Sequence, residues 1–319
     1  MIMLKNKNLI NCIAFLLILT LSLSVVSRVL AFKYDDGILQ MEQFYRQPRG
    51  SVDLLVLGSS HAFVDIDPTQ IEEQTGLRTY DLGASMQSIW HTYYDLEEAL
   101  KYQSPKLIIL DVFRMTETFD YSKESKLIKS VYGMRPSLTK LRAIQAGFSD
   151  TAPVAEVLTH FFEFPSYHSR YAELTTADLA FWTRPPKDYK GHYSLSESNP
   201  QQRPDLSDVT EKTPVEEKTA AYFLKILDTA KEKNIPVILV NVPYVVSADD
   251  QKIYRSMEDL IALYSADGQV TYLDLNQKVD EIGIDFETDF ADAEHLNEKG
   301  TEKLNRYLAD YLIKAGYNK

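Results

Sequence analysis

Five short apolar segments, separated by longer stretches with helical spacing, dominate the pattern of hydrophobic and polar positions after residue 50. They cover residues 52–57, 78–82, 106–112, 237–242 and 270–275. Continuous apolar runs of this length are typical of strands that are buried on both faces of a parallel sheet. Strands that alternate with helices imply crossover connections. The pattern therefore predicts an α/β fold, a three-layer sandwich around a doubly wound, mainly five-stranded parallel sheet.

Four helices are predicted from apolar spacing and from their end signals. Residues 68–76 begin with Pro68 in the first turn and end at Gly76, and residues 88–102 place apolar side chains on one face. Residues 214–233 and 298–315 have the same spacing, and Asn297 is expected to cap the last helix.

The N-terminus is a long apolar stretch, residues 9–32. Residues 9–27 alone give 19 positions, close to the ~20 that a membrane-spanning helix needs. Lys5 and Lys7 precede the stretch, and Asp35 and Asp36 follow it. The charges predict a cytoplasmic tail (1–8), a transmembrane anchor (9–32) and a single-pass protein of the cell membrane with its C-terminal domain outside. A cleaved signal peptide is the alternative, but its apolar core is usually only ~7–15 residues long.

The rest of the chain divides into a polar linker (33–51) and one domain (52–319). Between about residues 115 and 213 the strand–helix alternation disappears, and many aromatic residues occur there. We interpret this stretch as an insertion over or beside the site. Its role is left open by the sequence.

Composition excludes several classes of function. The net charge of −12 argues against a nucleic-acid partner. Cys12, within the apolar stretch, is the one cysteine, so the following domain has neither a disulfide nor a cysteine nucleophile. The histidines match no standard zinc spacing, and we predict no metal and no cofactor.

Two short segments carry the chemistry. The first apolar run ends in Gly58-Ser59-Ser60, and Asp292 stands three residues before His295, just ahead of the last predicted helix. A serine needs a base to take its proton, and the base needs a carboxylate to orient it. Parallel sheets place their sites at the carboxyl ends of the strands, where Ser60 would lie. Taken alone, His295 would be a histidine at a helix start; the combination favours catalysis.

These segments resemble the blocks of the SGNH (GDSL-like) hydrolase superfamily, which has an SGNH/flavodoxin-like fold. The first family block is Gly-Asp-Ser; here Ser59 takes the aspartate position and Ser60 that of the nucleophile. The last block, Asp-x-x-His, matches Asp292 and His295. The glycine of the second block matches Gly83, whose N–H would form an oxyanion hole with that of Ser60. The resemblance thus implies a Ser60–His295–Asp292 triad.

The chain departs from the family at its third block, where an asparagine usually completes the oxyanion hole. The third strand here ends in Asp111-Val112-Phe113-Arg114 and has no asparagine. Candidate substitutes and substrate contacts are Ser59, His61, Gln87, Arg114 and Asn241, with His61 expected at the rim of the site.

Gly-Ser-Ser behind an N-terminal anchor is similar to the membrane-tethered branch that modifies cell envelopes. That branch includes the D-alanyl transfer protein of teichoic acids and accessory proteins of polysaccharide O-acetyltransferases. The resemblance implies an extracytoplasmic acyltransferase or esterase that acts on an envelope polysaccharide or teichoic-acid-like polymer with a multispanning membrane O-acyltransferase as partner. A catalytically inactive scaffold that binds a glycan or that partner is the alternative.

Overall fold

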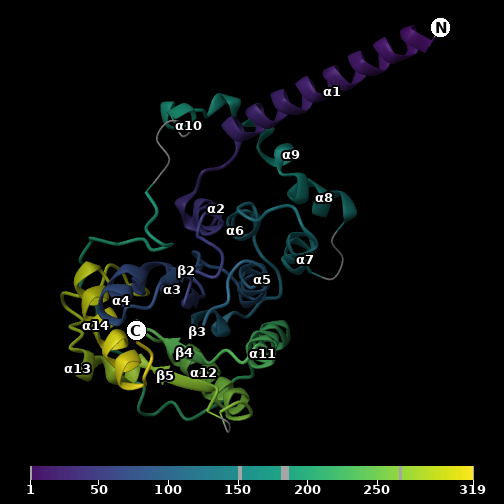
Figure 1. Cartoon of the computed structure of the whole chain (residues 1–319). Helices are drawn as coiled ribbons and strands as arrows, with labels where there is room; N and C mark the ends of the chain where they lie inside the picture. Colours follow the sequence, from purple (N-terminus) through teal and green to yellow (C-terminus); the bar gives the residue numbers. More distant parts are fainter. Residues whose placement is uncertain (1, 150–152, 181–186, 266–267, 319) are drawn as a thin grey trace. The chain divides into compact units, whose positions relative to one another are not determined.

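The computed structural model describes residues 2–149, 153–180, 187–265 and 268–318 (Figure 1). The chain forms two compact units. The larger comprises residues 34–153 and 188–319, and the smaller comprises residues 1–33 and 154–187. The larger unit contains all five strands, and we call it the sheet unit. The smaller contains the N-terminal helix, and we call it the N-terminal unit.

The sheet is parallel throughout and has the order β2-β1-β3-β4-β5. Its strands are β1 (Leu54–Leu57), β2 (Thr79–Asp81), β3 (Leu107–Asp111), β4 (Val237–Asn241) and β5 (Val270–Asp274). The predicted α/β fold with a five-stranded parallel sheet is confirmed. Because the strand order reverses beside β1, the carboxyl ends of β1 and β3 border the crevice where such sheets bind ligands.

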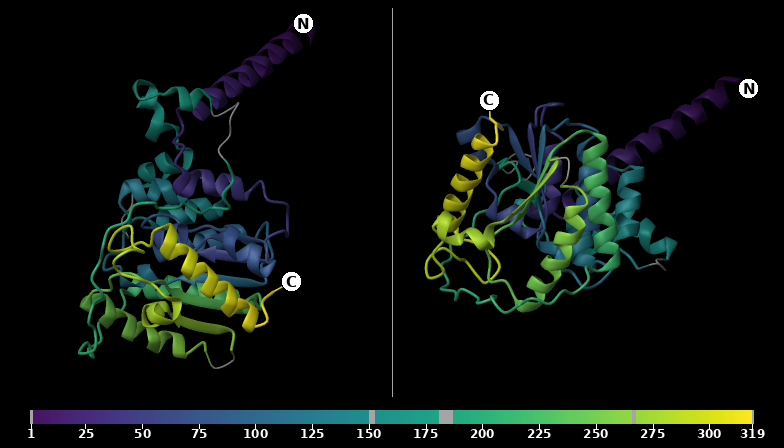
Figure 2. Two further views of the ribbon diagram at one scale, coloured as in Figure 1. Left: turned by 90° about the vertical axis from the view of Figure 1, so that its left-hand side faces the viewer. Right: turned by 90° about the horizontal axis from the view of Figure 1, so that it is seen from below.

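Helices cover both faces of the sheet (Figure 2). On one face, Leu54 and Val56 of β1 pack in a cluster with α3 (Ser60–Asp65), α4 (Pro68–Thr75) and α14 (Glu298–Lys314). Leu55 and Leu57 are equally buried on the opposite face. That side holds α5 (Ile89–Ala99), which packs against α11 (Glu217–Glu232) and α7 (Leu138–Ala146). Burial on both faces explains the unbroken apolar runs.

The remaining elements of the sheet unit are short except for one. They are η1 (Asp35–Leu39), α2 (Gln40–Phe44), η2 (Phe113–Thr116), α6 (Glu124–Val131), α12 (Ala248–Ala262), η4 (Leu275–Lys278) and α13 (Val279–Ile282). The sequence pattern did not indicate α12, which buries Ile253, Tyr254 and Met257.

The predicted caps are present. Asn297 accepts hydrogen bonds from the backbone amides of Lys299 and Gly300 at the start of α14. Gly76 follows α4 with a left-handed φ of 75°, a conformation that glycine adopts without steric cost.

Residues 34–51, most of the predicted linker 33–51, belong to the sheet unit. Ile38, Leu39, Met41 and Phe44 are buried in the sheet unit, and Tyr80 donates a hydrogen bond to the carbonyl oxygen of Gln40. These apolar residues are too few and too irregular to show a strand or helix period, so their burial depends on tertiary contacts.

The stretch 115–213 is divided between the two units. Residues 115–153 belong to the sheet unit through α6 and α7, and residues 154–187 belong to the N-terminal unit. Residues 188–213 return to the sheet unit without helix or strand, and Tyr193 and Asn199 donate backbone hydrogen bonds to Phe63 and Phe290. The aromatic residues at 181 and 182 lie outside the described residues.

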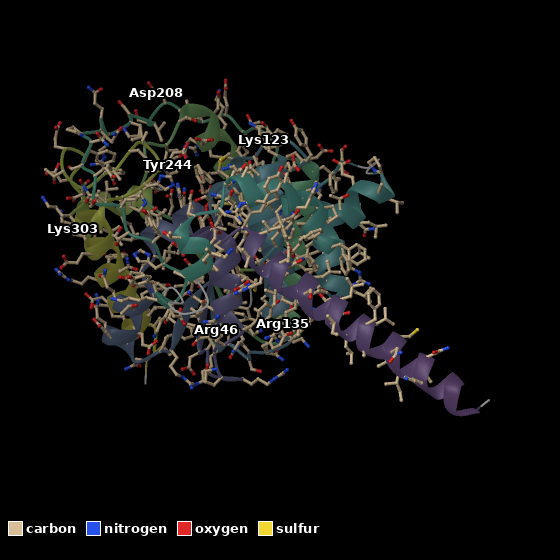
Figure 3. All side chains as sticks on the ribbon, turned by 90° about the horizontal axis from the view of Figure 1, so that it is seen from above. Arg46, Lys123, Arg135, Asp208, Tyr244 and Lys303 are labelled. Carbon is tan, nitrogen blue, oxygen red and sulfur yellow. The ribbon has the colours of Figure 1, made fainter. Side chains whose placement is uncertain are left out.

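The N-terminal unit consists of α1 (Ile2–Leu30), α8 (Val154–Phe162), α9 (Phe164–Tyr167), η3 (His168–Ala172) and α10 (Thr176–Ala180). Within α1, residues Lys7–Leu30 are long and apolar enough to cross a membrane, with a mean hydropathy of 2.6 in the most apolar window. None of that window is buried inside the protein, and its side chains project outward along the helix (Figure 3).

Candidate active site

The proposed nucleophile lies at a tight turn after β1. Gly58 has a φ of 150°, and a Cβ atom on it would come within 2.5 Å of the Asp111 Cβ. Ser59 then caps α3, and Ser60 is the first residue of that helix and is buried. Only glycine allows the β1 turn to approach β3 this closely, which sets the position of Ser60.

Asp111 at the end of β3 fixes this turn. Its Oδ2 accepts hydrogen bonds from the Ser59 hydroxyl (2.6 Å) and the Ser59 backbone N–H (3.0 Å). Its Oδ1 accepts one from the Phe113 N–H at 2.9 Å. Burial raises the pKa of Asp111, although these hydrogen bonds oppose the shift. Ser59, a predicted substrate contact, therefore uses its hydroxyl to hold the turn.

His295 and Asp292 form the pair that the sequence predicts. The His295 Nδ1 lies 3.0 Å and 3.1 Å from the two carboxylate oxygens of Asp292. The same carboxylate accepts hydrogen bonds from the backbone N–H groups of Glu294 and His295, each at 2.8 Å. Burial of Asp292 acts to raise its pKa, but these hydrogen bonds outweigh it and lower the pKa. An ionised Asp292 thus selects the tautomer in which Nδ1 carries the proton and leaves Nε2 as the acceptor.

The other ring nitrogen of His295 is unoccupied. The Nε2 atom is buried and has no hydrogen-bond partner among the described residues, Ser60 included. Catalytic hydrogen bonds often form only once substrate is present, so this geometry is compatible with a base that awaits its reaction partner.

Asp65 connects the two halves of the site. It stands at the end of α3, five positions after Ser60, and its Oδ1 accepts a hydrogen bond from the Leu296 N–H at 2.9 Å. Asn305 of α14 donates to the backbone carbonyl oxygen of Asp65, also at 2.9 Å. Burial raises the pKa of Asp65 well above its usual value. The helix that begins with the proposed nucleophile therefore holds the loop that carries His295.

His61 lies inside the protein and not at the rim where it was expected. Its ring is fully buried, stacks on Phe113 at 3.9 Å between centroids, and lies 5.6 Å from the ring of His295. Its ring also forms a T-shaped contact with Tyr244, labelled in Figure 3, at 5.1 Å between centroids. Burial lowers the pKa of His61 well below its usual value, with smaller contributions from His295 and Arg114. His61 is therefore a neutral imidazole at pH 7, and it links the nucleophile turn to His295.

The two predicted oxyanion donors differ in whether a group of the protein already accepts a hydrogen bond from them. The Ser60 N–H lies in the first turn of α3, where backbone amides have no intrahelical acceptor. The Gly83 N–H instead donates to the Asp81 Oδ1 at 2.6 Å. A Cβ on Gly83 would come within 2.6 Å of the Ala62 Cβ, so glycine allows this loop to pack on α3.

Two of the remaining candidates make contacts within the protein. The Gln87 side-chain amide donates to the carbonyl oxygens of Gly58 and Leu82, so it supports both loops. Asn241 is buried, and its amide nitrogen lies 3.5 Å from Asp274 of the neighbouring strand.

Arg114 is the candidate cation at this edge of the sheet. It forms an ion pair with Glu117 at 2.6 Å, and its buried Nε has no partner among the described residues. Its charge acts on both His61 and Asp111. Arg114 is thus a predicted substrate contact whose side chain has an unused hydrogen-bond donor close to the nucleophile turn.

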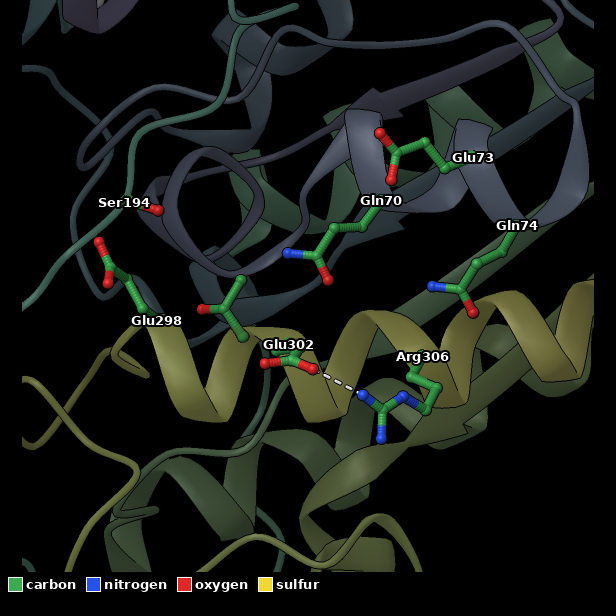
Figure 4. A pocket seen from close by; sticks show the side chains of 8 residues that line it. Gln70, Glu73, Gln74, Ser194, Glu298, Glu302 and Arg306 are labelled. Atoms are coloured by element: carbon green, nitrogen blue, oxygen red, sulfur yellow. Dashed lines mark hydrogen bonds and ion pairs between the residues drawn. The ribbon is translucent and has the colours of Figure 1, made fainter.

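A polar cleft of about 400 Å³ lies between α4 and α14 (Figure 4). Its lining comes from Gln70, Glu73, Gln74, Ser194, Glu298, Thr301, Glu302 and Arg306. Glu302 and Arg306 form an ion pair across one helical turn. The cleft is distinct from the Ser60–His295 region, because neither residue lines it.

The contacts of Asp65 and Asp111 were not expected from sequence. Asp111 follows an apolar strand and could have been recognised as an edge residue, but its partner Ser59 is 52 positions away. Among the described residues, no group of three His, Cys, Asp or Glu side chains is placed to hold a metal ion.

No family model and no curated protein matches this chain. Solved structures resemble it at low identity. A proposed acylhydrolase from Bacteroides fragilis NCTC 9343 is 12% identical with a TM-score of 0.44, over 89% of this chain and 99% of that one. A gut microbial diltiazem-metabolizing enzyme is 10% identical with a TM-score of 0.41, over 84% of this chain and 47% of that one. Likenesses this distant carry no information on activity.

Proposed function

We propose that this protein is an extracytoplasmic, membrane-anchored acyltransferase or esterase of the SGNH type. It would act on a cell-envelope polysaccharide or teichoic-acid-like polymer through Ser60, His295 and Asp292. The observation that carries the proposal is the hydrogen-bonded Asp292–His295 pair, whose free Nε2 belongs to a ring 5.6 Å from that of His61, the residue next to Ser60. A carboxylate-oriented histidine beside a serine at a strand end is the arrangement that serine acyl transfer requires.

In the first half-reaction, the Ser60 Oγ attacks the carbonyl carbon of the donor's acyl group while its proton passes to the His295 Nε2. The carbonyl oxygen becomes an oxyanion beside the Ser60 N–H. Collapse of this intermediate breaks the bond to the leaving oxygen, which takes the proton from His295. Asp292 stabilises the imidazolium that exists between these steps.

In the second half-reaction, a hydroxyl group of the acceptor gives its proton to His295 and attacks the acyl-serine ester. The ester bond to Ser60 breaks, and Ser60 recovers its proton from His295. If the acceptor is a sugar or polyol hydroxyl, the reaction is transfer; if it is water, the reaction is hydrolysis. The α1 helix supports transfer, because an anchored site has a raised effective concentration toward a donor held by a multispanning membrane O-acyltransferase.

The test is covalent labelling of the full-length protein with a fluorophosphonate probe, read by intact-protein mass. Wild type should gain one probe mass, and Ser60→Ala should gain none. Ser85→Ala, in the loop that follows the carboxyl end of β2, is the matched control and should label like wild type. Labelling that persists in Ser60→Ala would remove Ser60 from the mechanism.

Transfer and hydrolysis are separated by acceptor dependence. After acylation with a small activated ester, the decay of acyl-Ser60 should accelerate when envelope glycopolymer is added, and the acyl group should appear on the polymer. Decay that ignores the polymer would identify an esterase.

One observation favours a second candidate, a catalytically inactive scaffold that binds a glycan or a membrane O-acyltransferase. The Gly83 N–H already donates to Asp81, and the asparagine that usually serves as a donor at the end of β3 is absent from this sequence. A missing donor of this kind typically costs about 2.7–4 kcal/mol of transition-state stabilisation. Folded wild type that takes up no probe, alone or with its membrane partner, would support the scaffold.

A further inference from the structure

The end of α1 is held by two charged side chains, the nearby Lys33 and the distant Arg170. The Arg170 guanidinium donates to the carbonyl oxygens of Leu30 (2.6 Å) and Ala31 (2.7 Å). The Lys33 ammonium donates to the carbonyl oxygens of Val29 and Ala31, both at 2.9 Å. The last carbonyls of a helix have no intrahelical partners, and cations there also complement the helix dipole. Two cationic side chains thus cap the C-terminal end of the apolar helix.

Asp178 joins these cations to each other. Its Oδ1 lies 3.2 Å from both Lys33 and Arg170, and its Oδ2 accepts hydrogen bonds from the Thr175 N–H and hydroxyl. The rings of Phe32 and Tyr167 form a T-shaped pair with 6.2 Å between centroids. Residues 167–178 are therefore fastened to the point where α1 ends.

Helix α8 of the same unit carries an exposed apolar stripe. Val154, Leu158 and Phe162 recur at every fourth position, which places them on one face of the helix. Their exposed fractions are 74%, 44% and 65%. The opposite face is buried at Val157 and His160.

The exposed apolar side chains continue beyond α8. Tyr171 of η3 and Leu179 of α10 are exposed by 74% and 62%; Tyr171 lies within the segment fastened to α1, and Leu179 directly follows it. Isolated exposed apolar residues are ordinary, but a helical stripe together with aromatic residues at the end of a spanning helix is typical of the membrane–water interface.

We propose that residues 154–180 form an interfacial collar that binds the lipid surface where α1 leaves the bilayer. This proposal rests on the membrane anchoring of α1 given above, and it concerns attachment, not catalysis. The occupant is the lipid and not another protein, because the collar is continuous with α1: Arg170 and Lys33 hold it at the last turn of a helix that is otherwise uncovered. Val154, Leu158 and Phe162 would lie at the boundary between headgroups and acyl chains, and Arg170 and Lys33 at the level of the headgroups.

The test uses the full-length protein, one copy per nanodisc, with Cys12→Ser as background. Single cysteines at Leu158 and Phe162 carry an environment-sensitive fluorophore, and doxyl-labelled lipids act as quenchers. Leu263→Cys, at the C-cap of α12, is the matched control, since Leu263 is 72% exposed in the sheet unit. Leu17→Cys, in the middle of α1, reports insertion. We expect lipid quenching at 158 and 162 to exceed that at 263 at least twofold.

Each other outcome overturns the proposal in a different way. If 158 and 162 are quenched no more than 263 and are equally open to aqueous iodide, the collar faces water. If both are shielded from lipid and from iodide, a protein covers them. If 17 is not quenched, α1 is not inserted, and the anchoring fails together with the collar; probe labelling of Ser60 is independent of all three results.

Discussion

Two buried aspartates beside the proposed active site and one at the end of α1 are held in opposite ways. In the sheet unit, Asp65 and Asp111 receive hydrogen bonds from backbone amides and a serine hydroxyl, and burial raises the pKa of both. In the N-terminal unit, Asp178 contacts Lys33 and Arg170. Burial of Asp178 acts to raise its pKa, but hydrogen bonds from Thr175, Lys33 and Arg170 lower it to about 2.

This contrast distinguishes carboxylates that stabilise the fold from carboxylates that are retained for the position they occupy. A buried carboxylate beside cations contributes to folding, whereas one without a cation costs folding free energy in its ionised form. A carboxylate with this unfavourable effect on folding is typically found where the side chain is needed in a particular position, as at functional sites. Under the proposed function, the chemistry belongs to the sheet unit and the attachment to the N-terminal unit, so a change in one unit should leave the other undisturbed.

The largest expected effect comes from His295→Ala. Without its base, Ser60 loses its activation, and the rate of fluorophosphonate labelling should fall by at least about 10³-fold. The variant should remain in the membrane fraction, because His295 belongs to the sheet unit and the proposed attachment to the N-terminal unit. Loss of membrane attachment in this variant would break the separation between the units.

An intermediate effect is expected at Asp65, as a positioning residue. Asp65→Ala removes the acceptor of the Leu296 N–H and should slow labelling about 10–100-fold by displacing His295. Asp65→Asn keeps an acceptor oxygen and should restore most of the rate.

Because the pKa of Asp65 is higher in the folded than in the unfolded protein, ionised Asp65 destabilises the fold as pH rises from about 4. Asp65→Asn should therefore be at least as stable as wild type at pH 7. Equal labelling defects in both variants would contradict a positioning role.

The smallest effect on chemistry is expected at Asp178. Asp178→Asn should destabilise the segment 167–178 by about 1.5–3 kcal/mol, the usual range for hydrogen bonds to charged groups. Faster hydrogen exchange there, with unchanged exchange in α14, would report it, while labelling of Ser60 stays within twofold.

The pH dependence of this segment follows from the pKa of Asp178, about 2 in the folded protein against a usual 3.8. Because the pKa is lowered, the stabilisation is complete above about pH 4 and is lost as the pH falls toward 2. Pepsin cleavage within 167–178 should rise over that interval in wild type. Asp178→Asn should show a flatter profile, and an equally steep one would assign the acid sensitivity to other groups.

The sequence predicts those features that local signals determine. Strands buried on both faces produce apolar runs, and Asn297 and Gly76 are recognisable because capping depends on neighbouring residues. The Asp292–His295 pair is predictable for the same reason, since a three-residue spacing lets one carboxylate bond both the ring and its backbone N–H.

Contacts that depend on which strands and helices are neighbours in the fold cannot be predicted from local sequence signals. The Ser59–Asp111 bond exists because β1 lies beside β3, and the Asp65–Leu296 bond because α3 lies beside α14. His61 was expected at the rim because it follows the nucleophile, but the direction of its side chain depends on Phe113 and Tyr244.

The caps at the end of α1 differ in when they can form. Lys33 is two to four positions from its carbonyl partners, whereas Arg170 is 140 positions from Leu30. At ordinary synthesis rates, Arg170 is made roughly 7–28 s after Leu30. During biogenesis, Lys33 alone closes the helix end in that interval. The N-terminal unit is thus completed only after more than half of the chain has been translated, although its first helix emerges before every strand of the sheet.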